Sequence, residues 1–178
     1  MTSLSGANLV PKTHGRIAFR GVIDTLEAEV IEAQVLATER SACPKGSAGS
    51  GEKDICACLG EILEYLRAVI ASEVKEAPLP PPVLFGMDAG EIHRRSHEVF
   101  VSGAGGKPLL PACTDGPVAA RLNTLRAKVR EAELLAVRVF GPTDVEEAPP
   151  REDIILGMNR LSSALWWLYC DYVRRKLE

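Results

Sequence analysis

Apolar residues recur at helical spacing in four long stretches of the chain. They stand alternately three and four residues apart, which is typical of a helix that buries one side. The stretches run from about 14 to 40, 55 to 76, 118 to 139 and 154 to 172. A shorter stretch, "DAGEIHRRSHEVF", opens with Asp88, a good helix cap. Because strand-like alternation is absent, the pattern predicts an all-α, five-helix bundle of four long helices and one short one.

The segments between these stretches are rich in glycine and proline, which interrupt helices. Asp115 is expected to cap the helix that follows it, with Pro117 in the first turn. A chain of 178 residues is long enough for one well-buried domain and short for two, so residues 1–178 are predicted to be a single domain. Residues 1–11 precede the first helical stretch and are predicted to be a flexible N-terminal segment.

Composition narrows the classes of protein. Of 178 residues, 46% are hydrophobic and 25% charged, as in folded globular domains. A net charge of −3 offers no broad basic field for nucleic acid or an anionic membrane. No stretch is long and apolar enough to span a bilayer, and no secretion signal is visible. An odd number of cysteines, five, suits a reducing compartment, so a cytoplasmic location is expected.

Candidate chemistry begins in the fourth stretch, "ARLNTLRAKVREAELLAVRVF". Arg126 and Arg130 lie one turn apart, and Glu133 follows on the same side. One interpretation is a solvated charged stripe, in which a helical ion pair stabilises the helix by roughly a few tenths of a kcal/mol. The other is a pair of guanidinium groups for phosphate oxygens, oriented by the acid.

Two other helices also carry polar groups. The first has Arg16, Arg20 and Asp24 at intervals of four residues, preceded by Lys12. Asp24 stands among apolar neighbours, where a carboxylate is costly without a cationic partner. The last has Asn159, in "MNRLSS", on or near its apolar side. Polar groups on three helices of one bundle favour a shared binding site over three independent solvated faces.

The stretches "HGRIAFRGVIDTLEAEV", "DGPVAARLNTLRAKVREAE" and "MNRLSSALW" resemble the ATP:cob(I)alamin adenosyltransferases, a superfamily of trimeric five-helix bundles. The resemblance is strongest to the ethanolamine-utilization branch, which carries similar "FRxxLD", "LHxxSH", "LRxKVRExE" and "LNRLSS" motifs. It extends from about Leu9 to Leu165, nearly the whole chain. Four motifs in the same order with compatible spacing are fairly specific.

The resemblance implies roles for individual residues. Arg126 and Arg130 match arginines that contact ATP phosphates at a subunit interface. Asp24 matches the acid that pairs across this interface with Arg126, and these two are the predicted catalytic residues. The remaining predicted cofactor-binding residues are Lys12, Arg16, Arg130, Glu133, Asn159 and Phe100.

The reaction implied is attack by reduced cobalt, Co(I), on the 5′ carbon of ATP, with loss of triphosphate. The corrinoid carries the hard chemistry, so the protein need only position the reactants and neutralise charge on the leaving triphosphate. ATP, Mg²⁺ and cobalamin as substrate are therefore expected, bound by a homotrimer. A flavoprotein reductase is a candidate partner.

Three departures from the family pattern keep other functions open. Only "MTSLSG" stands where relatives have a Gly/Thr-rich phosphate loop, and the N-terminal His/Cys metal motif of the ethanolamine branch is not found. In "PLLPACTDG" no aromatic residue stands where relatives use one to displace a cobalt ligand, which leaves Phe85 and Phe100 as candidates. A non-catalytic corrinoid or ATP carrier or sensor is thus the alternative, and a purely structural bundle is a third.

His93 and His97 lie one turn apart on the short helix, a spacing that can hold a metal ion. No third ligand is evident, and the glutamate base of zinc hydrolases is missing. Helix packing or a place near the corrinoid is the simpler interpretation, so no metal site is predicted.

Overall fold

A computed structural model describes residues 1–5, 8–41, 54–101, 109–142 and 150–176. The helices are α1 (Gly15–Ser41), α2 (Ile55–Lys75), α3 (Ala89–Val101), α4 (Pro117–Phe140) and α5 (Glu152–Arg175). The other elements are the strands β1 (Thr2–Ser5) and β2 (Asn8–Val10) and a 3₁₀ turn, η2 (Cys113–Asp115). The all-α bundle with four long helices and one short helix is confirmed.

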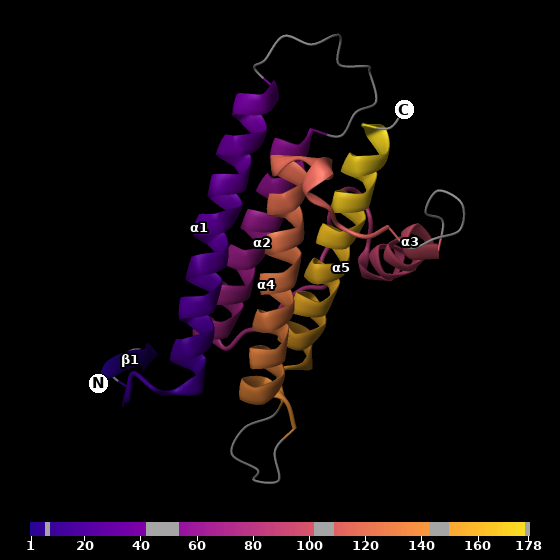
Figure 1. Ribbon diagram of the computed structural model, residues 1–178. Coiled ribbons are helices and arrows are strands. Elements are labelled where there is room, and N and C mark those ends of the chain that lie inside the picture. Colours follow the sequence, from indigo (N-terminus) through magenta and orange to yellow (C-terminus); the bar gives the residue numbers. More distant parts are fainter. Residues whose placement is uncertain (6–7, 42–53, 102–108, 143–149, 177–178) are drawn as a thin grey trace.

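The four long helices lie side by side, and the short α3 lies beside α5 at a steep angle to it (Figure 1). Helix α1 packs against α2 and α4, and α4 packs against α5. The chain reverses direction between α1 and α2 and again between α4 and α5 (Figure 1). Antiparallel pairing of α4 and α5 therefore places residues from opposite ends of the two helices beside one another.

The core follows the apolar repeat of the sequence. Fully buried side chains from all four long helices include Phe19, Ile23, Leu26, Leu59, Ile62, Leu66, Leu122, Leu125 and Ile154. At Gly157 of α5 the absence of a side chain is required, because a Cβ atom there would lie 2.6 Å from Oη of Tyr65. Helices α2 and α5 thus approach closely where Tyr65 crosses Gly157.

A short hairpin at the N-terminus was not predicted from the sequence. Strand β1 pairs antiparallel with β2, with Thr2 opposite Val10 and Ser3 opposite Leu9. Leu4 is buried, and its carbonyl oxygen accepts a hydrogen bond of 2.7 Å from Nη2 of Arg20. Strands of three and four residues are too short to show alternation in a sequence. The flexibility expected for residues 1–11 stays a prediction.

The two expected helix caps differ in outcome. Asp88 caps α3 as predicted, because its Oδ1 accepts a hydrogen bond of 2.8 Å from the amide of Glu91. Asp115 does not cap α4; its Oδ2 accepts a hydrogen bond of 2.7 Å from the amide of Ala112 and so closes the η2 turn. The last residue before α4 is Gly116, whose φ of 91° lies in the left-handed region that favours glycine.

In the described part of the chain, every helix falls short of the length or hydropathy that a membrane span requires.

Candidate functional site

The face shared by α4 and α5, hereafter the α4–α5 face, brings together residues predicted on both helices. The Arg126 guanidinium lies over the ring of Trp166, 5.1 Å from its centroid. Glu133 lies seven residues after Arg126 on α4, and Asn159 lies seven residues before Trp166 on α5. At that level Glu133 Oε1 accepts a hydrogen bond of 2.8 Å from Asn159 Nδ2. Seven residues of α-helix span about 10 Å. Arg130 lies on α4 between these two contacts and is exposed.

Arg126 is held in one orientation, while its terminal nitrogens have no hydrogen-bond partner in the part of the chain that the structure describes. Its Nε donates a hydrogen bond of 3.2 Å to Asn123 Oδ1. Burial lowers the pKa of the Arg126 guanidinium below its ordinary value, and the neighbouring charge of Arg130 lowers it further. Among the described residues, no carboxylate forms an ion pair with Arg126 or Arg130. Within the described ranges, the site therefore presents two guanidinium groups that no carboxylate pairs with.

Glu133 does not form the helical ion pair that a solvated stripe would contain. Its carboxylate is bonded to Asn159, whose own carbonyl oxygen Oδ1 accepts a hydrogen bond from Arg160 Nη1 at 2.5 Å. These contacts fix which way the Asn159 amide points. Arg160 was missed by the sequence analysis, although it stands next to Asn159 in "MNRLSS". Its Nε is buried and has no hydrogen-bond partner among the described residues.

Asp24 and Lys12 lie apart from this face within one chain. Asp24 is exposed on α1, and no described residue pairs with it. The expectation that Asp24 has apolar surroundings was wrong. Its neighbours Ile23 and Leu26 point into the core, whereas Asp24 is exposed. Lys12 is exposed in the segment before α1. Their roles toward the nucleotide stay predictions.

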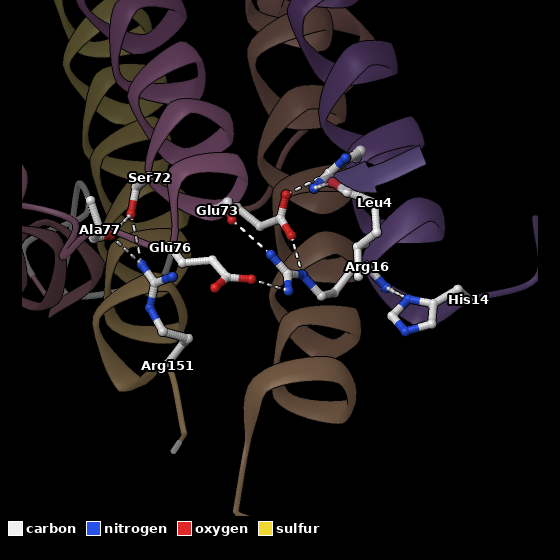
Figure 2. A network of polar contacts seen from close by, with 9 residues as sticks. Leu4, His14, Arg16, Ser72, Glu73, Glu76, Ala77 and Arg151 are labelled. Atoms are coloured by element: carbon white, nitrogen blue, oxygen red, sulfur yellow. Dashed lines mark hydrogen bonds and ion pairs between the residues drawn. The ribbon is translucent and has the colours of Figure 1, made fainter. Parts of the chain in front are cut away.

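Arg16 belongs to a different set of contacts, the Glu73 network (Figure 2). The Nε atoms of Arg16 and Arg20 pair with the two carboxylate oxygens of Glu73, which is fully buried. Arg16 also donates to Glu76 Oε1 and to the Glu73 carbonyl oxygen, both at 2.8 Å. Burial alone would lower the pKa of Arg16, but its hydrogen bonds to Glu76 and Glu73 raise it. Two cations and two carboxylates thus balance at this end of α1.

Contacts beside Glu76 join the end of α2 to the start of α5 (Figure 2). Arg151 Nη2 donates to Ser72 Oγ at 2.7 Å and to the Ala77 carbonyl at 2.8 Å. Arg151 also pairs with Asp153, which accepts a hydrogen bond of 2.7 Å from the amide of Leu79. This end of the bundle is therefore cross-linked by polar contacts from the hairpin to α5.

The two aromatic candidates for displacing a cobalt ligand are Phe85 and Phe100. Phe85 is buried in the core and stacks on Trp167, with ring centroids 5.8 Å apart. Phe100 belongs to α3, but its side chain lies outside the described residues. The rings of His93 and His97 contact one another on α3, with their centroids 4.6 Å apart. The described residues contain no cluster of three side chains suited to hold a metal ion.

Comparison with known proteins identifies the family of this chain. The family model for cobalamin adenosyltransferase matches residues 1–172. Corrinoid adenosyltransferase EutT of Salmonella typhimurium and that of Escherichia coli K12 are each 30% identical over 166 residues, or 93% of this chain. The alignments cover 56% of each relative, so the chain spans about half the length of the curated relatives it matches. No solved structure matches it. The chain belongs to the cobalamin adenosyltransferase family.

Proposed function

We propose that this protein transfers the 5′-deoxyadenosyl group of ATP to the cobalt of cob(I)alamin, releasing triphosphate and forming adenosylcobalamin. The observation that carries the proposal is the pair Arg126 and Arg130 on the α4–α5 face, two guanidinium groups with no carboxylate partner among the described residues. A cationic pair that the fold leaves unbalanced suits an anionic ligand.

The site would act by positioning and by charge. The terminal nitrogens of Arg126 and the whole guanidinium of Arg130 are open to phosphate oxygens, and Lys12 is a further candidate cation. As the 5′ carbon–oxygen bond breaks, negative charge accumulates on the departing triphosphate, and these groups stabilise it. Mg²⁺ would accompany the triphosphate. Glu133 and Asn159, locked to one another, would form a rigid polar wall beside it.

We infer that the active unit is a homotrimer whose sites lie between subunits. Asp24 stands exposed on the outer side of α1, where Ile31 and Val35 are 45% and 54% exposed. Exposed apolar side chains beside a carboxylate suit contact with a second copy of the chain. There Asp24 would pair with Arg126 of the partner subunit and orient it toward ATP. Light scattering of the purified protein, with Asp24→Arg as the variant, tests this assembly.

The cob(I)alamin substrate is a strong reductant and must be generated where it is used. We therefore place the protein in the cytoplasm, with a flavoprotein reductase as the electron donor and ethanolamine utilization as its setting.

The deciding experiment is anaerobic conversion of chemically reduced cob(I)alamin and Mg-ATP to adenosylcobalamin, followed by absorbance. The wild type is compared with Arg130→Ala and with Arg138→Ala, a matched control at another exposed arginine of α4. We expect turnover that is lost in Arg130→Ala and kept in Arg138→Ala. Tight binding of ATP and corrinoid without turnover would instead make the protein a carrier or sensor, and no binding would overturn the site.

A further inference from the structure

The ring on which Arg126 rests is itself held by a neighbour one turn further along α5. Trp166 stacks on Tyr169, with ring centroids 5.4 Å apart and planes inclined by 15°. Tyr169 is fully buried, and its hydroxyl donates a hydrogen bond of 2.5 Å to Asp115 Oδ2. A buried hydroxyl without a partner would be costly, so this bond fixes where the Tyr169 ring lies.

Asp115 is in turn part of the turn that leads into α4. The same oxygen, Oδ2, accepts the amide of Ala112, and the Asp115 carbonyl accepts a hydrogen bond of 3.0 Å from Lys176 Nζ. The turn ends at Gly116, whose left-handed φ of 91° allows α4 to begin at once. The start of α4 is thus attached to the last two turns of α5 by a carboxylate, a hydroxyl and an ammonium group.

A continuous series of contacts therefore runs from Asp115 through Tyr169 and Trp166 to Arg126. We propose that Tyr169 is a positioning residue: by bonding Asp115 and stacking on Trp166, it holds the Arg126 guanidinium in the orientation that receives the nucleotide. The proposal rests on the proposed function, in which Arg126 contacts ATP. Tyr169 touches neither ATP nor corrinoid in this proposal and acts only through Arg126.

The charges around this series favour a static arrangement near neutral pH. The hydroxyl of Tyr169 and the amide of Ala112 hold the pKa of the Asp115 carboxyl below its usual range, and Lys176 lowers it further. Burial and the Asp115 carboxylate raise the pKa of Tyr169, and burial raises that of the Cys170 thiol to about 12. Asp115 is thus charged and Tyr169 is a donor under assay conditions.

The test is a double-mutant cycle on the full chain. Tyr169→Phe keeps the stacked ring and removes only the hydroxyl, so we expect the KM for ATP to rise about fivefold. The value of kcat and the KM for corrinoid should stay close to wild type. In the Arg126→Ala background, Tyr169→Phe should change nothing further. Tyr172→Phe is the matched control, because Tyr172 contacts Lys176 through its ring alone.

A second measurement needs no ATP. The NMR signal of the Arg126 Nε–H, assigned by its loss in Arg126→Ala, should exchange slowly with water because Asn123 accepts its hydrogen bond. Tyr169→Phe should shift this signal and speed its exchange, whereas Tyr172→Phe should not.

The outcomes separate the two proposals. If the wild type binds no ATP, the proposed function fails, while the Arg126 signal still decides the role of Tyr169. If Tyr169→Phe acts equally with and without Arg126, or leaves the Arg126 signal unchanged, the positioning role is overturned.

Discussion

Two pairs of arginines in this molecule have the same spacing and opposite surroundings. Arg16 and Arg20 lie one turn apart on α1 and share the buried carboxylate of Glu73. Arg126 and Arg130 lie one turn apart on α4, and no described carboxylate pairs with either. The difference extends to proton affinity, because the pKa of Arg16 is raised and that of Arg126 is lowered.

The comparison shows that spacing alone does not distinguish a structural pair from a binding pair. In the Glu73 network each arginine forms an ion pair with a carboxylate, so removing one of these side chains should weaken the fold. On the α4–α5 face the cations repel one another, and their balance must come from outside the described chain. Substitutions in the first pair should therefore lower the stability of the fold, and substitutions in the second should weaken ligand binding.

The largest effect is expected from Glu73→Ala. Removing the carboxylate leaves Arg16 and Arg20, which are 20% and 18% exposed, without their shared partner. The free energy of unfolding should fall by about 3 kcal/mol, the lower end for breaking a buried ion pair. Urea denaturation followed by circular dichroism measures this, with Glu76→Ala at an exposed partner as the control. Equal losses in the two variants would contradict a dominant role for Glu73.

Arg130→Ala should show the reverse behaviour. The side chain is exposed and has no described partner, so the free energy of unfolding should stay within about 0.5 kcal/mol of wild type. ATP affinity should fall by about 2 kcal/mol, as for a lost charge-assisted hydrogen bond. Calorimetric titration with Mg-ATP measures the second quantity. A loss of stability comparable to that of Glu73→Ala would show that Arg130 stabilises the fold and would contradict a role in binding alone.

Ser163→Glu would make the second pair resemble the first. Ser163 is partly buried on α5 between Asn159 and Trp166, so a carboxylate there can reach toward Arg130. An intramolecular counter-charge should reduce ATP affinity about tenfold, and any gain in stability should be only a few tenths of a kcal/mol, roughly. Ser163→Gln, which has the same length without the charge, should bind ATP as the wild type does. Undiminished ATP binding in Ser163→Glu would show that the arginine pair is not the phosphate site.

The smallest effect concerns Asp115, a carboxylate whose closest partners are neutral donors. Hydrogen bonds from Tyr169 and the Ala112 amide lower the pKa of Asp115 in the folded state. Asp115 therefore stabilises the fold at pH values above its unfolded-state pKa of about 4. That contribution is lost as the pH falls through the folded-state pKa. Urea denaturation between pH 7 and pH 3 should therefore show a weaker acid dependence for Asp115→Asn than for wild type. Parallel profiles would refute this assignment.

Much of the fold could be predicted because every long helix carries an apolar repeat. One buried core position, Glu73, was not considered in the sequence analysis. It follows Val69 by four residues and continues the stripe formed by Leu59, Ile62 and Leu66. A carboxylate on such a stripe is a signal that a buried cationic partner exists. That signal would have assigned Arg16 and Arg20 to the fold.

Sequence reasoning could bring together residues of a single helix pair, but it could not supply the tertiary contacts that orient them. The roles of these residues in binding stay predictions. Arg126, Arg130, Glu133 and Asn159 do share one face, as the sequence analysis expected. The contacts that orient them come from residues with no recognisable pattern, such as Arg160. The hairpin and the turn before α4 are likewise fixed by hydrogen bonds to distant helices, which no local repeat encodes.

The adjacent residues Trp166 and Trp167 are the only two tryptophans in the chain, and they have different surroundings. Trp166 is partly buried under Arg126, whereas Trp167 is buried against Phe85. Indole emission depends on nearby charge and on access of water, so the first ring would respond to an occupant of the α4–α5 face while the second stays constant. The molecule therefore contains an intrinsic fluorescent reporter with its own internal reference, and Trp166→Phe and Trp167→Phe would separate the two signals without any attached dye.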